Sequence, residues 1–205
     1  VRQTGGKVTG VSTTRGDIDC DKLGIVVAGH SGQLANMAGF RLPMESVALQ
    51  ALVSEPIKPC MDVVVMANTV HGYMSQSDKG EMVIGGGTDG YNNYTQRGSF
   101  HHIEETVRAL VETFPMISRL KMLRQWGGIV DVTGDRSPIL SKTPVEGVFI
   151  NGGWGTGGFK AIPGSGWGFA ELMAKGHSPL TDAFGLERFA EGRFIDESVA
   201  AGVAH

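Results

Sequence analysis

A glycine-rich segment followed by a lysine is the part of the chain with the clearest capacity for chemistry. Residues 152–160 read Gly-Gly-Trp-Gly-Thr-Gly-Gly-Phe-Lys and follow the apolar run 148–151. Glycines let backbone N–H groups approach a ligand without interference from side chains. A helix that begins behind them adds partial positive charge and unpaired donors. The segment therefore predicts a site for an anion or an electron-rich ring edge, with tight strand–helix packing as the alternative.

Other arrangements of reactive residues are weaker. The glycine segment matches neither the phosphate-binding loop nor the nicotinamide-binding fingerprint, because the spacing and the following acidic residue are missing. His101 and His102 lie together at the start of an expected helix, without a third ligand at metal-site spacing. No Ser-His-Asp or Cys-His arrangement follows from the spacing. We therefore predict no metal site and no side-chain nucleophile.

Short apolar runs between turn residues predict the elements that position these groups. The expected strands are residues 7–13, 18–22, 25–28, 47–54, 63–67, 72–76, 81–84 and 148–151. The expected helices are residues 32–38, 99–114 and 164–175. The first two strands form a hairpin. The strand 25–28 is typical of a parallel strand buried on both faces.

Two further groups of residues lie at the ends or faces of these elements. Gly29, His30 and Ser31 follow the strand 25–28, where they either approach a ligand or cap the next helix. His71 and Tyr73 alternate along one strand and so share a face, where they form either a pocket or part of the core.

The elements predict a mixed α/β fold with many antiparallel neighbours. Residues 1–39 and 133–205 would form one domain, and residues 40–132 a second sheet with the helix 99–114 packed on it.

Composition supports a folded chain: 41% of the 205 residues are hydrophobic and 19% are charged. A net charge of −3 argues against a nucleic-acid-binding surface, and no apolar run is long enough to span a membrane.

The 31 glycines are about twice the average fraction and show no collagen period. Cys20 and Cys60 have no zinc-site spacing, which predicts two free buried thiols in a reducing cytoplasm. The chain begins with Val1 and no initiator methionine or signal peptide, so we expect it to be a fragment that starts within a domain.

Residues 153–163 resemble the C-terminal flavin motif of the D-amino-acid oxidase-like, FAD-dependent oxidoreductases. A wider pattern is similar to the β subunits of heterotetrameric sarcosine oxidases, and it is carried by residues 29–31, 50–55, 85–87, 126–131, 135–139 and 200–205. The resemblance spans essentially the whole chain and implies the C-terminal half of such a subunit. It implies that residues 1–39 and 133–205 are a remnant of the FAD-binding domain and that residues 40–132 bind substrate.

The resemblance also implies roles for individual residues. Lys160 would bind the substrate carboxylate, with a solvated surface lysine as the alternative, and His71 and Tyr73 would line the amine pocket. The residues expected to contact FAD are Gly29, His30, Gly128, Gly155, Thr156, Gly157, Gly158, Phe159 and Lys160.

The activity implied by the resemblance is oxidation of sarcosine by hydride transfer to FAD. Glycine and formaldehyde would form, or the one-carbon unit would pass to tetrahydrofolate at a partner subunit. Electrons would pass to FMN and oxygen, and the alpha, gamma and delta subunits would be partners in the cytoplasm. A proline or dimethylglycine dehydrogenase relative is the alternative enzyme, and a non-catalytic interaction module that retains the fold is the alternative class.

The resemblance also implies that parts of the protein lie before Val1, and the sequence differs from monomeric relatives at two positions. The N-terminal unit that holds the FAD pyrophosphate, and the histidine that attaches FMN, would precede Val1, so we expect the chain by itself to be inactive and to hold little FAD. Gly128 stands where monomeric relatives attach FAD to cysteine, which implies non-covalent FAD. Val83 stands where those relatives carry a lysine that activates oxygen, which implies slow reaction of FAD with oxygen.

Overall fold

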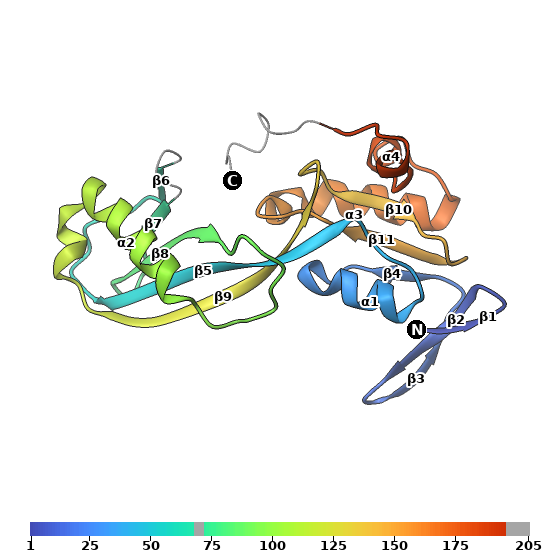
Figure 1. Ribbon diagram of the computed structural model, residues 1–205, viewed down its shortest axis with the longest axis horizontal. Helices are drawn as coiled ribbons and strands as arrows, with labels where there is room; N and C mark the ends of the chain where they lie inside the picture. Colours follow the sequence, from blue (N-terminus) through green and yellow to red (C-terminus); the bar gives the residue numbers. More distant parts are fainter. Residues whose placement is uncertain (68–71, 196–205) are drawn as a thin grey trace. The chain divides into compact units, whose positions relative to one another are not determined.

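The computed structural model describes residues 1–67 and 72–195 (Figure 1). These residues form two compact units: residues 1–46 with 130–195, and residues 47–129. Two parts of the sequence singled out above, His71 and the segment 200–205, lie outside the described residues. The predicted mixed α/β class is confirmed, with antiparallel pairs in both units. The predicted domain boundaries, 39/40 and 132/133, lie three to seven residues from the divisions between the units, 46/47 and 129/130.

A three-stranded sheet forms the centre of the first unit. Its order is β10 (Ile139–Lys142), β11 (Val148–Gly152) and β4 (Leu23–Ile25), and β4 runs parallel to β11 while β10 is antiparallel. The helices α1 (Ser31–Met37) and α3 (Gly158–Lys175) belong to the same unit.

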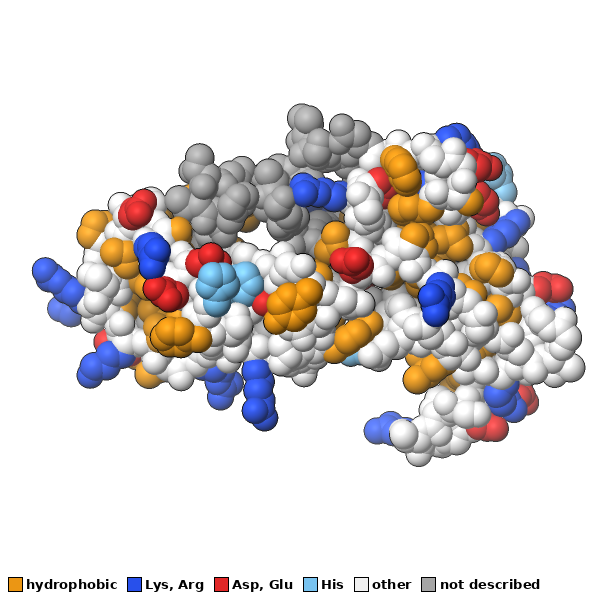
Figure 2. All heavy atoms as spheres, viewed as in Figure 1, with side chains coloured by type: hydrophobic (Ala, Val, Ile, Leu, Met, Phe, Trp, Pro, Cys, Tyr) orange, Lys and Arg blue, Asp and Glu red, His pale blue; other side chains and the backbone are white. Residues whose placement is uncertain are grey.

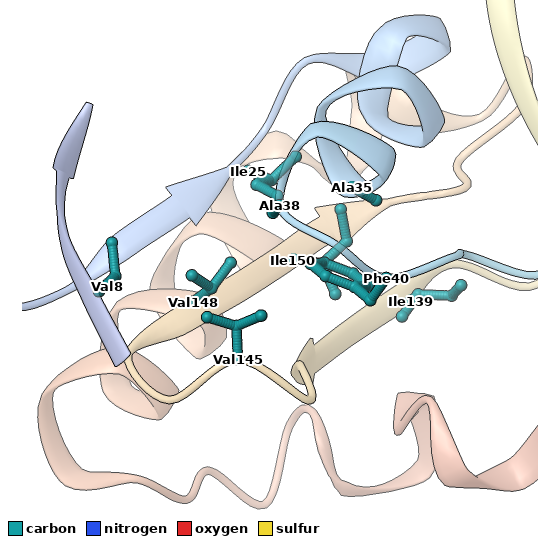
Figure 3. Packing of buried hydrophobic residues seen from close by; sticks show 9 residues of the cluster. All are labelled: Val8, Ile25, Ala35, Ala38, Phe40, Ile139, Val145, Val148 and Ile150. Atoms are coloured by element: carbon teal, nitrogen blue, oxygen red, sulfur yellow. The ribbon is translucent and has the colours of Figure 1, made fainter. Parts of the chain in front are cut away.

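The side chains of β11 alternate between two cores. Val148 and Ile150 belong to the cluster that contains Ala35 of α1 (Figure 3). Phe149 belongs to the cluster that contains Phe169 of α3. Because successive strand residues point to opposite faces, α1 and α3 cover opposite faces of the sheet.

The chain enters this unit through an antiparallel sheet of β1 (Arg2–Thr4), β2 (Lys7–Thr13) and β3 (Gly16–Asp19). The predicted hairpin is confirmed, although its second strand begins at Gly16. Val8 on β2 is 1% exposed and joins the core that contains α1. The unit ends with the 3₁₀ helix η4 (Asp182–Phe184) and the helix α4 (Glu187–Ala190).

The prediction of a fully buried strand over residues 25–28 was wrong. Pairing of β4 with β11 ends at Ile25, and the 3₁₀ helix η1 (Ala28–His30) follows. Val26 and Val27 are 58% and 39% exposed. The chain leaves the sheet here to reach α1, so these apolar residues have no sheet neighbour to bury them.

The second unit contains a five-stranded sheet of order β6-β7-β8-β5-β9. The strands are β5 (Met44–Pro56), β6 (Val65–Ala67), β7 (Gly72–Gln76), β8 (Glu81–Thr88) and β9 (Met122–Thr133). The helix α2 (Phe100–Thr113) is followed by the 3₁₀ helix η3 (Pro115–Arg119). Leu110 of α2 packs on Met74 and Ile84 of the sheet. The Oγ atom of Ser99 caps α2, which confirms the predicted start of this helix.

The helix α3 begins six residues earlier than predicted. Its first turns contain Gly158, Pro163 and Gly164, which disfavour a helix in isolation. Burial of Phe169 and Leu172 against the sheet supplies stabilisation that local propensity does not show.

Two predictions from composition can be compared with the structure. Both cysteines are free, but Cys60 is exposed and Cys20 only partly buried, so the expectation of two buried thiols was wrong. Among the described residues, no helix is long and apolar enough to cross a membrane.

Candidate functional site

The glycine-rich segment lies at an edge of the first unit's sheet that is suited to ligand binding. The strands β4 and β11 are parallel, so their carboxyl ends lie at the same edge. From β4 the chain continues to α1 on one face, and from β11 it continues to α3 on the other. In open α/β sheets, ligands bind outside the carboxyl ends of the strands where connections diverge in this way.

Two glycines give the turn after β11 its shape. Gly153 has φ +77° and Gly155 has φ +53°, in the left-handed region that side chains disfavour. A Cβ atom on Gly153 would lie 2.7 Å from Cγ2 of Thr133. Gly153 therefore needs to be glycine for two reasons. An ideal Cβ on Gly155 would meet only the Asp131 carbonyl oxygen, at 3.9 Å, so its backbone conformation alone favours glycine.

The turn is held by the last residues of β9, which belong to the same unit. Gly153 donates its N–H to Oδ2 of Asp131 at 2.5 Å, and Gly155 donates to the Asp131 carbonyl at 2.8 Å. Between these bonds, Trp154 forms an isolated antiparallel bridge with Val132. The role of Asp131 was not predicted, because its spacing from the turn in sequence gives no sign of their contact.

The first turn of α3 presents backbone donors next to this turn. Its N-cap residue, Gly157, offers no side-chain hydrogen bond, and the first N–H groups of an α-helix have no acceptor within the helix. Phe159 is 89% exposed. Lys160 is also exposed and forms no ion pair within residues 1–67 and 72–195. The predicted contacts Gly155, Thr156, Gly157, Gly158, Phe159 and Lys160 thus form one continuous surface segment.

The residues after β4 contribute to the same edge. Gly29 is buried and its carbonyl accepts a hydrogen bond from Oγ of Ser46 at 2.6 Å, while His30 is exposed. Ser31 is fully buried, and its Oγ atom has no hydrogen-bond partner among the described residues. An ideal Cβ on Gly152 would lie 3.3 Å from that Oγ and 3.1 Å from Oδ2 of Asp131. Ser31 and Asp131 therefore both lie beside the start of the turn.

A buried ion pair supports the segment between β9 and β10. Arg188 donates to both carboxylate oxygens of Asp135, at 2.7 and 3.0 Å, and to the carbonyl of Ser137 at 2.9 Å. The backbone N–H of Ile195 also donates to Asp135. Burial raises the pKa of the Asp135 carboxyl, but the hydrogen bonds outweigh that effect and leave the pKa below its ordinary value.

The other predicted site residues with described positions lie in the second unit. Tyr73 packs over Gly85, whose ideal Cβ would lie 2.3 Å from the phenol oxygen. Burial raises the pKa of the Tyr73 phenol, which favours its neutral form. Gly128 lies on β9 with open space above its Cα atom, and Trp126 is 39% exposed.

The second unit also contains a polar network that was not predicted. Asp89 accepts hydrogen bonds from Gln50 at 2.9 Å and from Asn93, and lies 3.0 Å from Nε2 of His102. Gln50 accepts from the backbone of Ser99, at the start of α2. Histidine and acidic side chains lie together at the surface over α2 (Figure 2). The prediction that the chain has no metal site is not tested by the structure. No cluster of three metal-ligating side chains occurs among the described residues.

A comparison of two glycine substitutions tests the packing of Tyr73. We expect Gly85→Ala to destabilise the second unit by about 1–3 kcal/mol, because the new methyl group must displace the Tyr73 ring. Gly128→Ala is the matched control, since no atom lies within 4 Å of its ideal Cβ. Urea unfolding measures both free energies. Equal stability of the two variants would contradict the packing described here.

Comparison with protein families gives a match over most of the chain. Residues 1–172 match the family model described as FAD dependent oxidoreductase. Among curated proteins, the chain is 80% identical over 205 residues to sarcosine oxidase subunit beta of Rhodobacter capsulatus, and 54% identical over 202 residues to that of Arthrobacter sp. These alignments span 100% and 98% of the chain but 50% of each relative. The chain therefore spans about half the length of the curated relatives it matches.

Solved structures share the fold at lower identity. L-proline dehydrogenase from P. horikoshii has a TM-score of 0.82 and 24% identity, over 92% of this chain and 52% of that one. Glycine oxidase from Geobacillus kaustophilus has a TM-score of 0.75 and 20% identity, over 87% of this chain and 48% of that one. These structures confirm the predicted fold, and the family model and the curated relatives confirm the resemblance predicted from the sequence motifs.

Proposed function

The chain belongs to the FAD-dependent oxidoreductase family, and from that premise we propose that it forms part of a sarcosine oxidase β subunit. The observation that carries the proposal is its 80% identity, over all 205 residues, to the Rhodobacter capsulatus subunit. In this proposal residues 1–39 and 133–205 belong to the FAD-binding domain, and residues 40–132 belong to the substrate-binding domain.

The residues at the carboxyl edge of the first unit fit FAD. The turn 153–155 has no side chain over Gly155, and the exposed first turn of α3 offers N–H groups with the positive end of the helix dipole. The buried, unpartnered hydroxyl of Ser31 lies beside the same turn. Such donors suit the polar edge of a flavin or its phosphates. We propose Gly29, His30 and the segment 155–160 as the contacts at this edge. Gly128 is proposed as a further contact on the resemblance alone.

Bound FAD would supply the hydride acceptor for oxidation of a secondary amine. The chain's own residues would orient the substrate and stabilise charge. Lys160 would bind the carboxylate of sarcosine through its exposed ammonium, which forms no ion pair with the described residues. His71 and Tyr73 would line the amine pocket, and the amides of residues 155–158 would stabilise negative charge that develops on the cofactor.

The finer parts of the proposal follow from the similarity to sarcosine oxidase β subunits. The products would be glycine and a one-carbon unit, released as formaldehyde or transferred to tetrahydrofolate at another subunit. The alpha, gamma and delta subunits would be partners, and FMN would be a second cofactor through which electrons reach oxygen. Val83 lies on β8. In this proposal its apolar side chain corresponds to the oxygen-activating lysine of monomeric relatives, and electrons would leave by a separate route.

The experiment that tests the function uses the complete complex that contains this chain. We expect an absorbance band at about 450 nm from the oxidised flavins of the complex, and we expect anaerobic sarcosine to bleach it. Loss of this absorbance measures reduction of the bound flavin. Dimethylglycine and L-proline are the control substrates. Faster bleaching by either control would favour the alternative dehydrogenases, and a complex without flavin would refute the proposal.

A further inference from the structure

Asp131 differs from the other buried carboxylate of the first unit in what surrounds it. It is 2% exposed, and no arginine, lysine or histidine pairs with it within residues 1–67 and 72–195. Asp135, by contrast, is held by the guanidinium of Arg188. The hydrogen bond to the Asp131 side chain comes from the N–H of Gly153, the first residue of the glycine-rich turn.

From this geometry we infer that Asp131 is a positioning residue of the FAD site. Its carboxylate and its backbone carbonyl together hold the turn 153–155, and the turn sets where the first N–H groups of α3 point. The inference rests on the function proposed above, because it concerns the site where FAD would bind. Asp131 acts through the turn, so no contact between its side chain and the cofactor or the substrate is required.

The turn's own hydrogen bonds, from Gly157 to the carbonyl of Trp154 and from Nε1 of Trp154 to Asn151, leave the N–H groups of Gly153 and Gly155 to be paired by Asp131. Glycine loses more conformational freedom on folding than any other residue, and both Gly153 and Gly155 take left-handed conformations. The N-cap residue Gly157 contributes no side-chain hydrogen bond to α3. Asp131 holds the turn at both ends, through Gly153 at 2.5 Å and Gly155 at 2.8 Å. A hydrogen bond to a charged acceptor is stronger than one between neutral groups.

The charge of Asp131 predicts a second, electrostatic effect. A carboxylate that is buried without a cation adds negative potential at the carboxyl edge of the sheet, where screening by water is weak. Reduction adds negative charge to a flavin bound at that edge. Removal of the Asp131 charge should therefore make reduction easier, an effect that a purely structural residue would not produce.

Two substitutions separate these effects. In Asp131→Asn the amide oxygen can still accept the N–H of Gly153, but the charge is lost. In Asp131→Ala both the acceptor and the charge are lost. The matched control is Ser141→Ala, which removes another buried acceptor in the same unit: Oγ of Ser141 accepts the N–H of Leu186 at 3.1 Å. Each variant is prepared in the complete complex, and three quantities are measured: the FAD dissociation constant, the unfolding temperature, and the midpoint potential of bound FAD.

We expect Asp131→Ala to weaken FAD binding by about tenfold to a hundredfold, the loss typical of a hydrogen bond to a charged group. Asp131→Asn should weaken FAD binding less and shift the midpoint potential of the FAD to a more positive value. Ser141→Ala should lower the unfolding temperature without changing the FAD affinity or potential. If Asp131→Ala does not fold, Asp131→Asn alone tests the inference through the potential.

Two outcomes would overturn the inference and differ from failure of the proposed function. In the first, both Asp131 variants bind FAD with the affinity and potential of the parent complex. In the second, FAD affinity falls only in proportion to the unfolding temperature and the midpoint potential is constant, as general destabilisation of the unit would produce. Failure of the parent complex to bind FAD would instead refute the proposed function, and the inference with it.

Discussion

Substitution of Lys160 by methionine is expected to slow anaerobic reduction of the flavin by sarcosine by about tenfold to more than a hundredfold. Methionine keeps most of the apolar stem but removes the ammonium that would bind the substrate carboxylate. Loss of a hydrogen bond to a charged group typically costs about 1.5–3 kcal/mol, which corresponds to this range. Lys160 is exposed on the first turn of α3, so the substitution leaves the core and the turn 153–155 unchanged.

Stopped-flow absorbance of the complete complex measures this rate, and the flavin content of the purified variant shows whether the site is still formed. Lys175→Met is the matched control, because Lys175 lies at the other end of α3 and is also exposed, in an ion pair with Glu171. We expect normal flavin content in both variants and slow reduction only in the first. A Lys160 variant that is reduced at the parent rate would remove this residue from the substrate site.

Substitution of Arg188 by methionine is expected to lower the free energy of unfolding by about 3–5 kcal/mol, the usual cost when one partner of a buried ion pair is removed. The side chains of Arg188 and Asp135 are 3% and 2% exposed, so the remaining carboxylate would stay buried without its cation. The bonds from Arg188 to the carbonyls of Ser137 and Gly185 would also be lost. Urea unfolding of the complete protein measures the change.

The double variant Arg188→Met with Asp135→Asn is the control, because it removes both charges and should recover part of the lost stability.

The contribution of Asp135 to the stability of the fold depends on pH. The pKa of Asp135 is lowered in the folded state, so its stabilising contribution is present above the unfolded value of about 3.8 and is lost as the pH falls below it. The parent protein should therefore lose more stability than the double variant between neutral pH and pH values of about 3. Identical acid profiles would show that this ion pair does not contribute.

Local sequence patterns predicted much of the second unit. The apolar residues Ile103, Val107 and Leu110 repeat along one face of α2, and Ser99 precedes them as a cap, so both the helix and its start were correctly placed. The strands β5, β7 and β8 show apolar runs between turns and were found within a few residues of their ends.

The strand β9 was missed because its sequence lacks such a run. Gln125, Trp126, Gly127 and Gly128 interrupt any alternation, and their fit depends on distant residues. The N–H of Gly127 bonds to the carbonyl of Gln96 at 2.8 Å, and a Cβ on Gly127 would lie 3.2 Å from the carbonyl oxygen of Thr95. The structural reason for this glycine is the close approach of a loop about thirty residues earlier in the chain, which no short-range pattern contains.

The candidate site could be predicted only in part, because it too depends on contacts between residues that are distant in the sequence. The glycines and Lys160 are contiguous, so their composition and order indicated a ligand-binding junction. Asp131, Ser31 and the pair of Asp135 with Arg188 are separated from that junction or from each other by about twenty residues or more, and only the tertiary fold brings them into contact. Burial also depends on neighbours: Val26 and Val27 are apolar like the residues of β4, but they leave the sheet and are exposed.

The alternation of β11 between two cores limits how the length of this chain can vary. Both faces of β11 are packed, with Ile150 on one side and Phe149 on the other. Deletion or insertion of one residue within the strand would exchange these side chains and leave a cavity in one core and a clash in the other. The number of residues in β11 and the distance from this strand to the glycine-rich turn are therefore expected to stay constant during evolution.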